Sequence, residues 1–213
     1  MKNLADLIVL PESIANMTEE EWAERDRRVA AARNMPVQIV VRDAVAEARK
    51  RGVPHLAADI VAAGLVDNPA VDAVREWDAS AMKRGGILVL AGDKGTGKTV
   101  AAAWWAIASG ARFMRASAFA RASRYDAGFD ALLAEPSLVI DDLGSEFNDG
   151  GGSFRVNLDE LIDVTYSDYH RLIITTNCTA DEFRIRYGER IMDRLRERGA
   201  WVGVVGESLR RAP

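Results

Sequence analysis

The sequence predicts an α/β fold built on a parallel sheet. The first observation behind this prediction is a glycine-rich segment, residues 92–99, which spells G-x-x-x-x-G-K-T between the apolar run 87–91 and a helix-favouring stretch. The second is an alternation of short apolar runs with helical segments, the pattern of βαβ units. The third is a pair of acids, Asp141 and Asp142, at the end of one apolar run.

The first 84 residues are expected to be helical and to precede the sheet. Residues 18–21 form a capping box, with threonine at the N-cap and glutamate three positions later. Asn68 and Pro69 suit the N-cap and the first position of a further helix. We therefore divide the chain into an N-terminal helical region, residues 1–84, that acts as a partner-binding and linker segment, and a sheet domain, residues 85–213.

The sheet domain should contain five strands. Apart from the run that precedes the glycine-rich segment, the apolar runs cover residues 113–116, 138–140, 172–177 and 201–205. The run 138–140 is short and fully apolar, which suits a strand that is buried on both faces of a parallel sheet.

Composition excludes several classes of protein. The 213 residues carry a formal net charge of −4, so any contact with nucleic acid has to come from a local patch. The single cysteine, Cys178, allows no internal disulfide and points to a reducing compartment. No apolar stretch approaches ~18 residues, and the start lacks the pattern of a signal peptide. We therefore expect a soluble, cytoplasmic protein without a membrane contact.

Residues 92–99 have the composition of a phosphate-binding loop. Glycines let the backbone N–H groups turn inward, where they and the following helix N-terminus hold a polyphosphate. Lys98 would reach the β- and γ-phosphates, and the Thr99 hydroxyl would bind Mg²⁺. The predicted phosphate-binding residues are Gly92, Gly95, Thr96, Gly97, Lys98 and Thr99. The alternative is a glycine-rich turn that binds nothing.

Polar residues that end two apolar strands would complete the site. Ligands of open α/β sheets bind at the carboxyl ends of the strands. Asp141 would hold Mg²⁺ against Thr99, directly or through water, and Asp142 would orient or deprotonate the attacking water. Asn177 ends the run 172–177 and could sense the γ-phosphate, or it could cap the following turn.

An arginine-rich helix follows, with Arg190, Arg194 and Arg198 at a spacing of four residues on one face. One interpretation is a solvated face with acid partners on the same helix. The other is that an arginine projects into the nucleotide site of a neighbouring subunit. The spacing does not distinguish the two.

Together these segments resemble the AAA+ ATPase core of the DnaC/DnaI-type helicase loaders, with the transposition helper IstB as a relative. The matching segments are residues 92–99, 140–146, 173–177, 187–196 and 206–210. The resemblance implies a P-loop NTPase of the AAA+ (ASCE) class. That class has a three-layer core around a parallel sheet ordered 5-1-4-3-2, here preceded by the helical region and without a C-terminal lid domain. The sheet domain would then be the ATPase core.

The resemblance also implies roles for individual residues. It places Walker A at residues 92–99, Walker B at Asp141 and Asp142, sensor I at Asn177 and a sensor-II-like arginine at Arg210. Arg194 would be a trans-acting arginine finger, with Arg190 as the second choice. The cofactors would be ATP and Mg²⁺. Because Asp142 is shorter than the glutamate that many AAA+ proteins carry there, hydrolysis is expected to be slow.

The partners that the resemblance implies are a replicative DnaB-type helicase, single-stranded DNA and further copies of the chain, assembled on ATP. A basic and aromatic cluster could contact the DNA, or it could form an amphipathic helix beside the sheet. Its members are Arg112, Arg115, Phe119, Arg121, Arg124 and Tyr125.

Three alternatives stay open. An IstB-like helper ATPase would share every motif and differ in its partner, a transposase. A small-molecule P-loop kinase would need an acceptor pocket and a mobile lid. A non-hydrolysing adaptor would use ATP only to set its shape.

Overall fold

The computed structural model describes residues 41–66, 68–81, 85–123, 126–146 and 153–205. The predicted capping box near the N-terminus and the predicted sensor-II-like Arg210 lie outside these ranges. Everything below therefore concerns the compact unit that begins at Val37.

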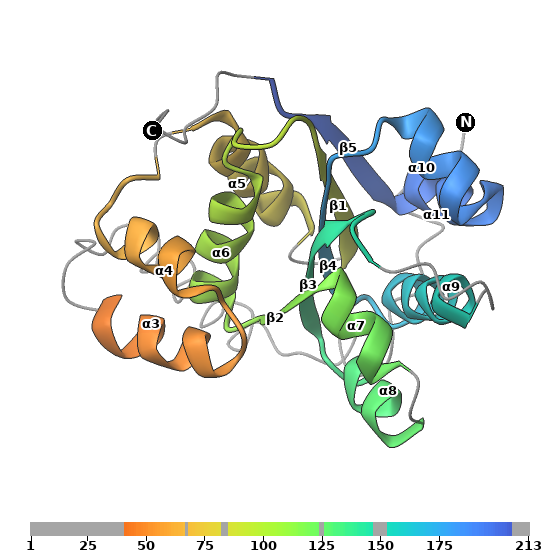
Figure 1. The fold of residues 1–213 in the computed structure, drawn as a ribbon, viewed down its shortest axis with the longest axis horizontal. Helices are drawn as coiled ribbons and strands as arrows, with labels where there is room; N and C mark the ends of the chain where they lie inside the picture. Colours follow the sequence, from red (N-terminus) through yellow and green to blue (C-terminus); the bar gives the residue numbers. More distant parts are fainter. Residues whose placement is uncertain (1–40, 67, 82–84, 124–125, 147–152, 206–213) are drawn as a thin grey trace, which may run out of the picture. The chain divides into compact units, whose positions relative to one another are not determined.

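Five parallel strands form one sheet (Figure 1). They are β1 (Gly86–Ala91), β2 (Arg112–Arg115), β3 (Ser137–Leu143), β4 (Arg171–Thr176) and β5 (Gly199–Gly203). Their order across the sheet is β2-β3-β4-β1-β5, which is the predicted 5-1-4-3-2 order read from the other edge. The glycine-rich loop and the two acids therefore follow strands that are separated only by β4.

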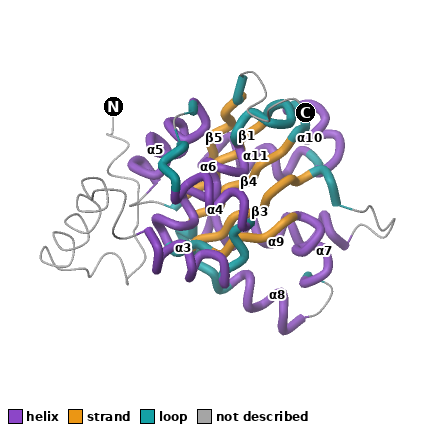
Figure 2. Tube along the Cα trace, turned by 60° about the vertical axis from the view of Figure 1, so that its left-hand side comes forward, coloured by secondary structure: helices purple, strands orange, loops and turns teal. Residues whose placement is uncertain are grey.

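Helices cover both faces of the sheet, and the strands lie between two helical layers in Figures 1 and 2. One layer contains α3 (Val41–Lys50), α4 (His55–Ala62), α5 (Pro69–Ala81) and α6 (Lys98–Ser109). The other contains α7 (Ala116–Ala122), α8 (Asp126–Leu133), α9 (Ser153–Ser167), α10 (Ala180–Tyr187) and α11 (Glu189–Arg198). Among the described residues, no helix combines the length and the apolar character needed to cross a membrane.

The alternation of side chains along each strand divides the core into two parts. In β1, Leu88 and Leu90 join the cluster under α3–α6, whereas Ile87 and Val89 join the cluster under α7–α11. Successive strand residues point to opposite faces, so a strand that is apolar at every position has a helical layer on each side. This explains why the strands read as continuous apolar runs.

Helix α5 begins where the sequence predicts. The Asn68 side chain accepts hydrogen bonds from the backbone N–H groups of Ala70 (3.0 Å) and Val71 (3.1 Å), so it is the predicted N-cap. The sequence predicts the last strand at residues 201–205, whereas β5 covers residues 199–203. The reason is that β5 starts directly after α11, where Gly199 pairs with Ile87 of β1.

Helices α3, α4 and α5 share a hydrophobic core with the sheet domain. Val45, Val61 and Val74 are buried in one cluster with Ala102 of α6 and Leu88 of β1. The predicted domain boundary between residues 84 and 85 stays a prediction. Because α3–α5 share a core with the sheet, removing them would test it.

Candidate functional site

The glycine-rich loop joins the buried strand β1 to α6. Gly97 is the N-cap of α6 in a left-handed conformation with φ +90°. The Gly92 N–H donates to the Thr176 carbonyl at 3.2 Å. A Cβ on Gly92, at φ +152°, would lie 2.3 Å from the Val204 carbonyl oxygen. Only glycine allows this close approach, which holds the loop between the ends of β4 and β5.

Lys98 is the first residue of α6, and its ammonium group lies inside the curve of the loop. Its Nζ donates to the carbonyls of Gly92 and Asp93, both at 2.7 Å, and to Asn177 Oδ1 at 3.1 Å. The side chain is buried, with 7% of the residue exposed. These oxygen acceptors compensate for the burial of its charge, and they place that charge at the carboxyl end of the sheet.

Thr99 lies next to Asp141, as predicted for the two ligands of one ion. Thr99 Oγ1 donates to Asp141 Oδ1 at 2.9 Å. Two neighbouring oxygen ligands of one Mg²⁺ ion, each at about 2.1 Å, are about 3.0 Å apart, so the spacing of this pair fits two ligands of the same ion. Because Mg²⁺ keeps several water and phosphate ligands, two protein ligands suffice.

Asp141 is the most buried acid of the site, with 4% exposed. Burial raises the pKa of its carboxyl, and hydrogen bonds from Thr175 and Thr99 act in the opposite direction. The Thr175 hydroxyl donates to Asp141 Oδ1 at 2.7 Å. A buried carboxylate of this kind favours a nearby cation, because a positive charge offsets the cost of desolvation.

Asp142 and Asn177 face each other across the ends of β3 and β4. Asn177 Nδ2 donates to Asp142 Oδ1 at 3.0 Å, while its Oδ1 accepts from Lys98. Asp142 has φ +60°, and the pairing of β3 with β4 shifts register between Ile140 and Leu143. This irregularity ends the regular alternation of β3 and lets two successive acids serve the same site.

The structure thus brings together Lys98, Thr99, Asp141, Asp142 and Asn177, as predicted. Thr96 also belongs to the loop, where its hydroxyl donates to the Asp93 carbonyl at 3.0 Å. Gly95 lies in the same loop with φ +93°.

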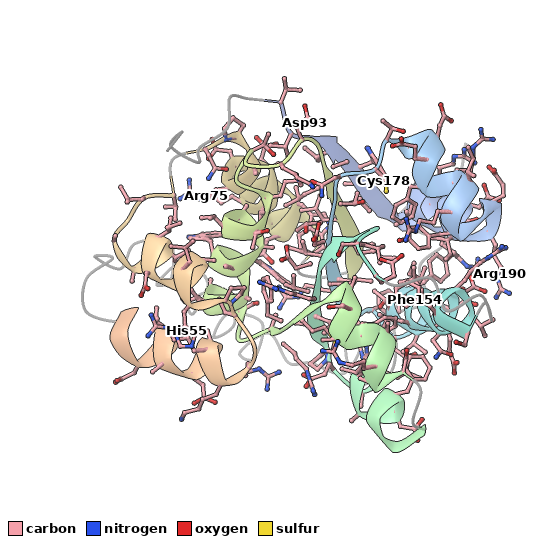
Figure 3. All side chains as sticks on the ribbon, viewed as in Figure 1. His55, Arg75, Asp93, Phe154, Cys178 and Arg190 are labelled. Carbon is pink, nitrogen blue, oxygen red and sulfur yellow. The ribbon has the colours of Figure 1, made fainter. Side chains whose placement is uncertain are left out.

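The arginines of α11 lie elsewhere. Arg194 Nε donates to Asp163 Oδ1 of α9 at 2.9 Å, and its guanidinium lies 4.9 Å from the centre of the Tyr166 ring. Arg190 of α11 pairs with Asp163 and Asp159, which both lie on α9. In Figure 3, Arg190 lies well away from Asp93 of the loop. Of the acid partners predicted on α11 itself, Glu197 lies 3.9 Å from Arg194. The other two, Glu189 and Asp193, pair with Arg196 instead.

Of the two interpretations of the basic and aromatic cluster, contact of Phe119 with DNA is wrong. Phe119 is fully buried, and its ring packs against those of Phe129 and Phe154. Arg112 pairs with Glu135 at 3.5 Å. The alternative, a helix packed beside the sheet, is what the structure shows for α7. Arg124 and Tyr125 lie outside the described residues.

The sequence predicts no place in the site for Thr175 or Asn68, although both lie there. Thr175 contacts both acids, because its hydroxyl also accepts from the Asp142 N–H at 2.9 Å. Two adjacent threonines at the end of an apolar strand were an available signal. Asn68 lies against the loop, where a Cβ on Gly97 would be 3.2 Å from its side chain. Only the packing of α5 reveals this proximity.

No protein-family model and no curated protein matches the sequence. Solved structures do. The DnaC helicase loader aligns at 24% identity over 65% of this chain and 92% of its own, with a TM-score of 0.54. DnaI aligns at 18% identity over 68% of this chain and 86% of its own, with a TM-score of 0.50. DnaA bound to AMPPCP and single-stranded DNA aligns at 16% identity over 67% of this chain, with a TM-score of 0.54.

The chain has the AAA+ P-loop fold. The aligned part of this chain spans 48% of DnaA and 44% of a DNA replication initiation factor. The predicted α/β fold with a five-stranded parallel sheet between helical layers is confirmed. The solved structures named above, which share it, are replication initiators and loaders.

Proposed function

We propose that this AAA+ chain is an ATP-dependent switch of the helicase-loader type. The observation that carries the proposal is the 2.9 Å contact of Thr99 with Asp141, beside a lysine that is held by the loop and by Asn177. These residues come from three separate segments, and P-loop NTPases use the same residue types to bind a nucleoside triphosphate with magnesium.

The residues divide the work of binding and hydrolysis. The loop backbone at Gly92, Gly95, Thr96 and Gly97 would cradle the phosphates, and Lys98 would exchange its carbonyl acceptors for phosphate oxygens. Thr99 and Asp141 would hold Mg²⁺. When bound, the ion supplies positive charge that neutralises the charge developing on the transferred phosphoryl group.

Asp142 and Asn177 would act on the attacking water. Asp142 would orient the water and accept its proton. Asn177 would contact the γ-phosphate and also hold Asp142 in place. Asp142 reaches less far than a glutamate would, and Asn177 occupies one of its oxygens at 3.0 Å. Both features support slow turnover.

Arg194 would contribute to a neighbouring subunit's site rather than its own. Arg194 is bound to Asp163 of α9, and Arg190 of the same helix lies well away from Asp93 of the loop in Figure 3, which supports a role in trans. Arg190 is the second choice, and Arg210 would contact the nucleotide as a sensor-II-like residue. The protein would then assemble on ATP, hold single-stranded DNA and deliver a DnaB-type helicase, in keeping with the DnaC loader that shares its fold. Residues 1–84 would contain the partner-binding region, and we propose a cytoplasmic location.

The test is Lys98→Ala, measured as the affinity for a fluorescent ATP analogue and as capture of a replicative helicase or of a transposase. A hydrogen bond to a charged group contributes about 1.5–3 kcal/mol, so the affinity should fall at least about 10-fold. Lys94→Ala is the matched control, because Lys94 lies in the same loop with an exposed side chain.

Unchanged ATP affinity in Lys98→Ala would contradict the proposal. Capture of a transposase with no capture of a helicase would redirect it to the IstB-like function. A phosphorylated nucleoside product would redirect it to a small-molecule kinase.

A further inference from the structure

A buried carboxylate near the site has no role in the function proposed above. Glu146 lies just after β3, and only 6% of the residue is exposed. Its Oε1 accepts from the Tyr187 hydroxyl at 2.6 Å and from Arg186 Nε at 3.0 Å. Its Oε2 accepts from the Gly144 N–H at 2.7 Å. Because a buried charge needs such partners, this set of contacts is a specific arrangement and not an incidental surface pair.

The first end of this arrangement is the segment 142–146, which begins with Asp142. A Cβ on Gly144, at φ +109°, would lie 2.9 Å from the Cys178 sulfur. The Thr176 hydroxyl donates to the Leu143 carbonyl at 2.6 Å. The segment is therefore packed tightly on the end of β4, next to Asn177, and it has little room to move independently of that strand.

The second end is the junction of α10 with α11. Tyr187 is the last residue of α10, and Gly188, with φ +99°, separates it from α11. The Tyr187 ring is fixed by Phe183, at 4.6 Å between ring centres. Burial and the hydrogen bond with Glu146 raise the pKa of the Tyr187 hydroxyl, so it stays protonated and donates. Helix α11, which carries the arginines, begins two residues later.

Hydrogen bonds thus join the lysine of the loop to Asn177 and Asn177 to Asp142. Glu146 in turn joins the segment after Asp142 to the end of α10, two residues before α11 begins. We propose that Glu146 is a positioning residue that couples the γ-phosphate side of the site to the orientation of α11. Through it, ATP bound in one subunit sets the arginine that this subunit offers to its neighbour. The proposal rests on the function proposed above and adds its regulation.

The test uses the full chain with Tyr187→Phe, which removes one hydroxyl and keeps the ring, and with Glu146→Gln. We expect the affinity for the ATP analogue to stay within about 2-fold of wild type. The kcat of ATP hydrolysis in the presence of an oligo(dT) strand, and ATP-dependent assembly in sedimentation velocity, should fall by about 10-fold or more, because the coupling free energy of 1–3 kcal/mol typical between sites corresponds to 5–150-fold.

Asp78→Asn is the matched structural control. Asp78 is a partly buried carboxylate that accepts from Trp105 Nε1 (2.7 Å) and Arg171 Nη1 (2.9 Å), beside the start of β4 instead of its end. The Asp78→Asn variant should lower the melting temperature, as Glu146→Gln does, and should leave the kcat of ATP hydrolysis unchanged.

The proposal is overturned if Tyr187→Phe keeps the wild-type kcat and assembly, or if Asp78→Asn loses kcat and assembly as strongly as Tyr187→Phe does, because the losses would then follow from lowered stability alone. Should Glu146→Gln fail to fold, Tyr187→Phe alone decides. Failure of the proposed function would look different, because the wild-type chain itself would then bind no ATP.

Discussion

At the scale of single residues, Asp141 combines two opposing demands. Its position at the carboxyl end of a central strand suits a magnesium ligand, yet the same position removes its carboxylate from water. Burial raises its pKa in the folded chain above the ordinary value of 3.8, and the two threonine hydroxyls only partly compensate. A charge that stabilises a bound cation therefore destabilises the fold when that cation is removed.

The prediction at this scale is that Asp141→Asn raises the free energy of unfolding at pH 7 in EDTA while it abolishes magnesium-dependent ATP binding. The raised pKa makes the folded wild type bind more protons than the unfolded chain above pH 3.8, so wild type loses stability as pH rises through the folded pKa. The asparagine amide of the variant does not ionise, so the variant does not lose stability in this way. Its oxygen still accepts hydrogen bonds from Thr99 and Thr175.

The measurement is urea denaturation at several pH values. The advantage of the variant should be small near pH 3.8 and grow as pH rises. Asp168→Asn, at an exposed position, is the control and should show no comparable trend. A variant less stable than wild type at pH 7 would contradict the argument.

At the scale of elements, the pair α9 and α11 determines where the arginines lie. Asp163 of α9 accepts from Arg190 and Arg194, and Tyr166 lies under the Arg194 guanidinium. The hydrogen bond with Asp163 raises the pKa of Arg194, which stays charged. These contacts hold Arg194 in one orientation before any partner arrives, and a preorganised arginine loses less conformational freedom when it binds a phosphate.

The prediction at this scale concerns Arg194→Ala. Single-subunit ATP affinity should stay near that of wild type, because the side chain lies away from the loop of its own subunit. Assembly-dependent turnover should fall by at least about 10-fold, since the arginine fingers of other NTPases raise kcat by about 10³–10⁵-fold. Affinity at low protein concentration and turnover at high concentration separate the two effects.

Arg196→Ala is the control on the same helix, because Arg196 pairs with Glu189 and Asp193 within α11. If Arg194→Ala weakened ATP binding by the single subunit, the role would be in cis. If turnover were unchanged, Arg190 would be the next residue to test.

At the scale of the whole molecule, the sheet depends on helices from the first part of the chain. Val71, Val74 and Trp77 of α5 are buried against α6, and the Trp77 and Trp105 rings meet edge to face at 5.6 Å between their centres. Each such side chain contributes about 1.5–3 kcal/mol on burial. The three from α5 together contribute ~4.5–9 kcal/mol, which is comparable to the ~5–15 kcal/mol stability of a typical protein.

We therefore predict that a chain beginning at residue 37 unfolds in one cooperative thermal transition and that a chain beginning at residue 85 does not. The shorter chain lacks α3–α5, so it exposes one side of α6. Circular dichroism and calorimetry provide the measurement. Cooperative unfolding of residues 85–213 at the same temperature as residues 37–213 would instead support the predicted boundary at residue 84.

The sequence by itself determined the features that contiguous residues encode. Glycine spacing sets the course of the loop, apolar runs set the strands, and acids or amides at strand ends must meet at one edge of a parallel sheet. Lys98, Asp141 and Asn177 could be found in this way because strand order alone brings them together.

The tertiary structure alone decided contacts between side chains from separate elements. Glu146 meets Tyr187 across 41 positions, and Asp163 meets Arg194 across 31. The sequence left open whether Phe119 contacts DNA or packs beside the sheet, and it is buried because α7 turns its ring toward two other phenylalanines. Such contacts depend on how helices pack and rotate on the sheet, and the packing of many side chains sets that rotation, which no local pattern of residues encodes.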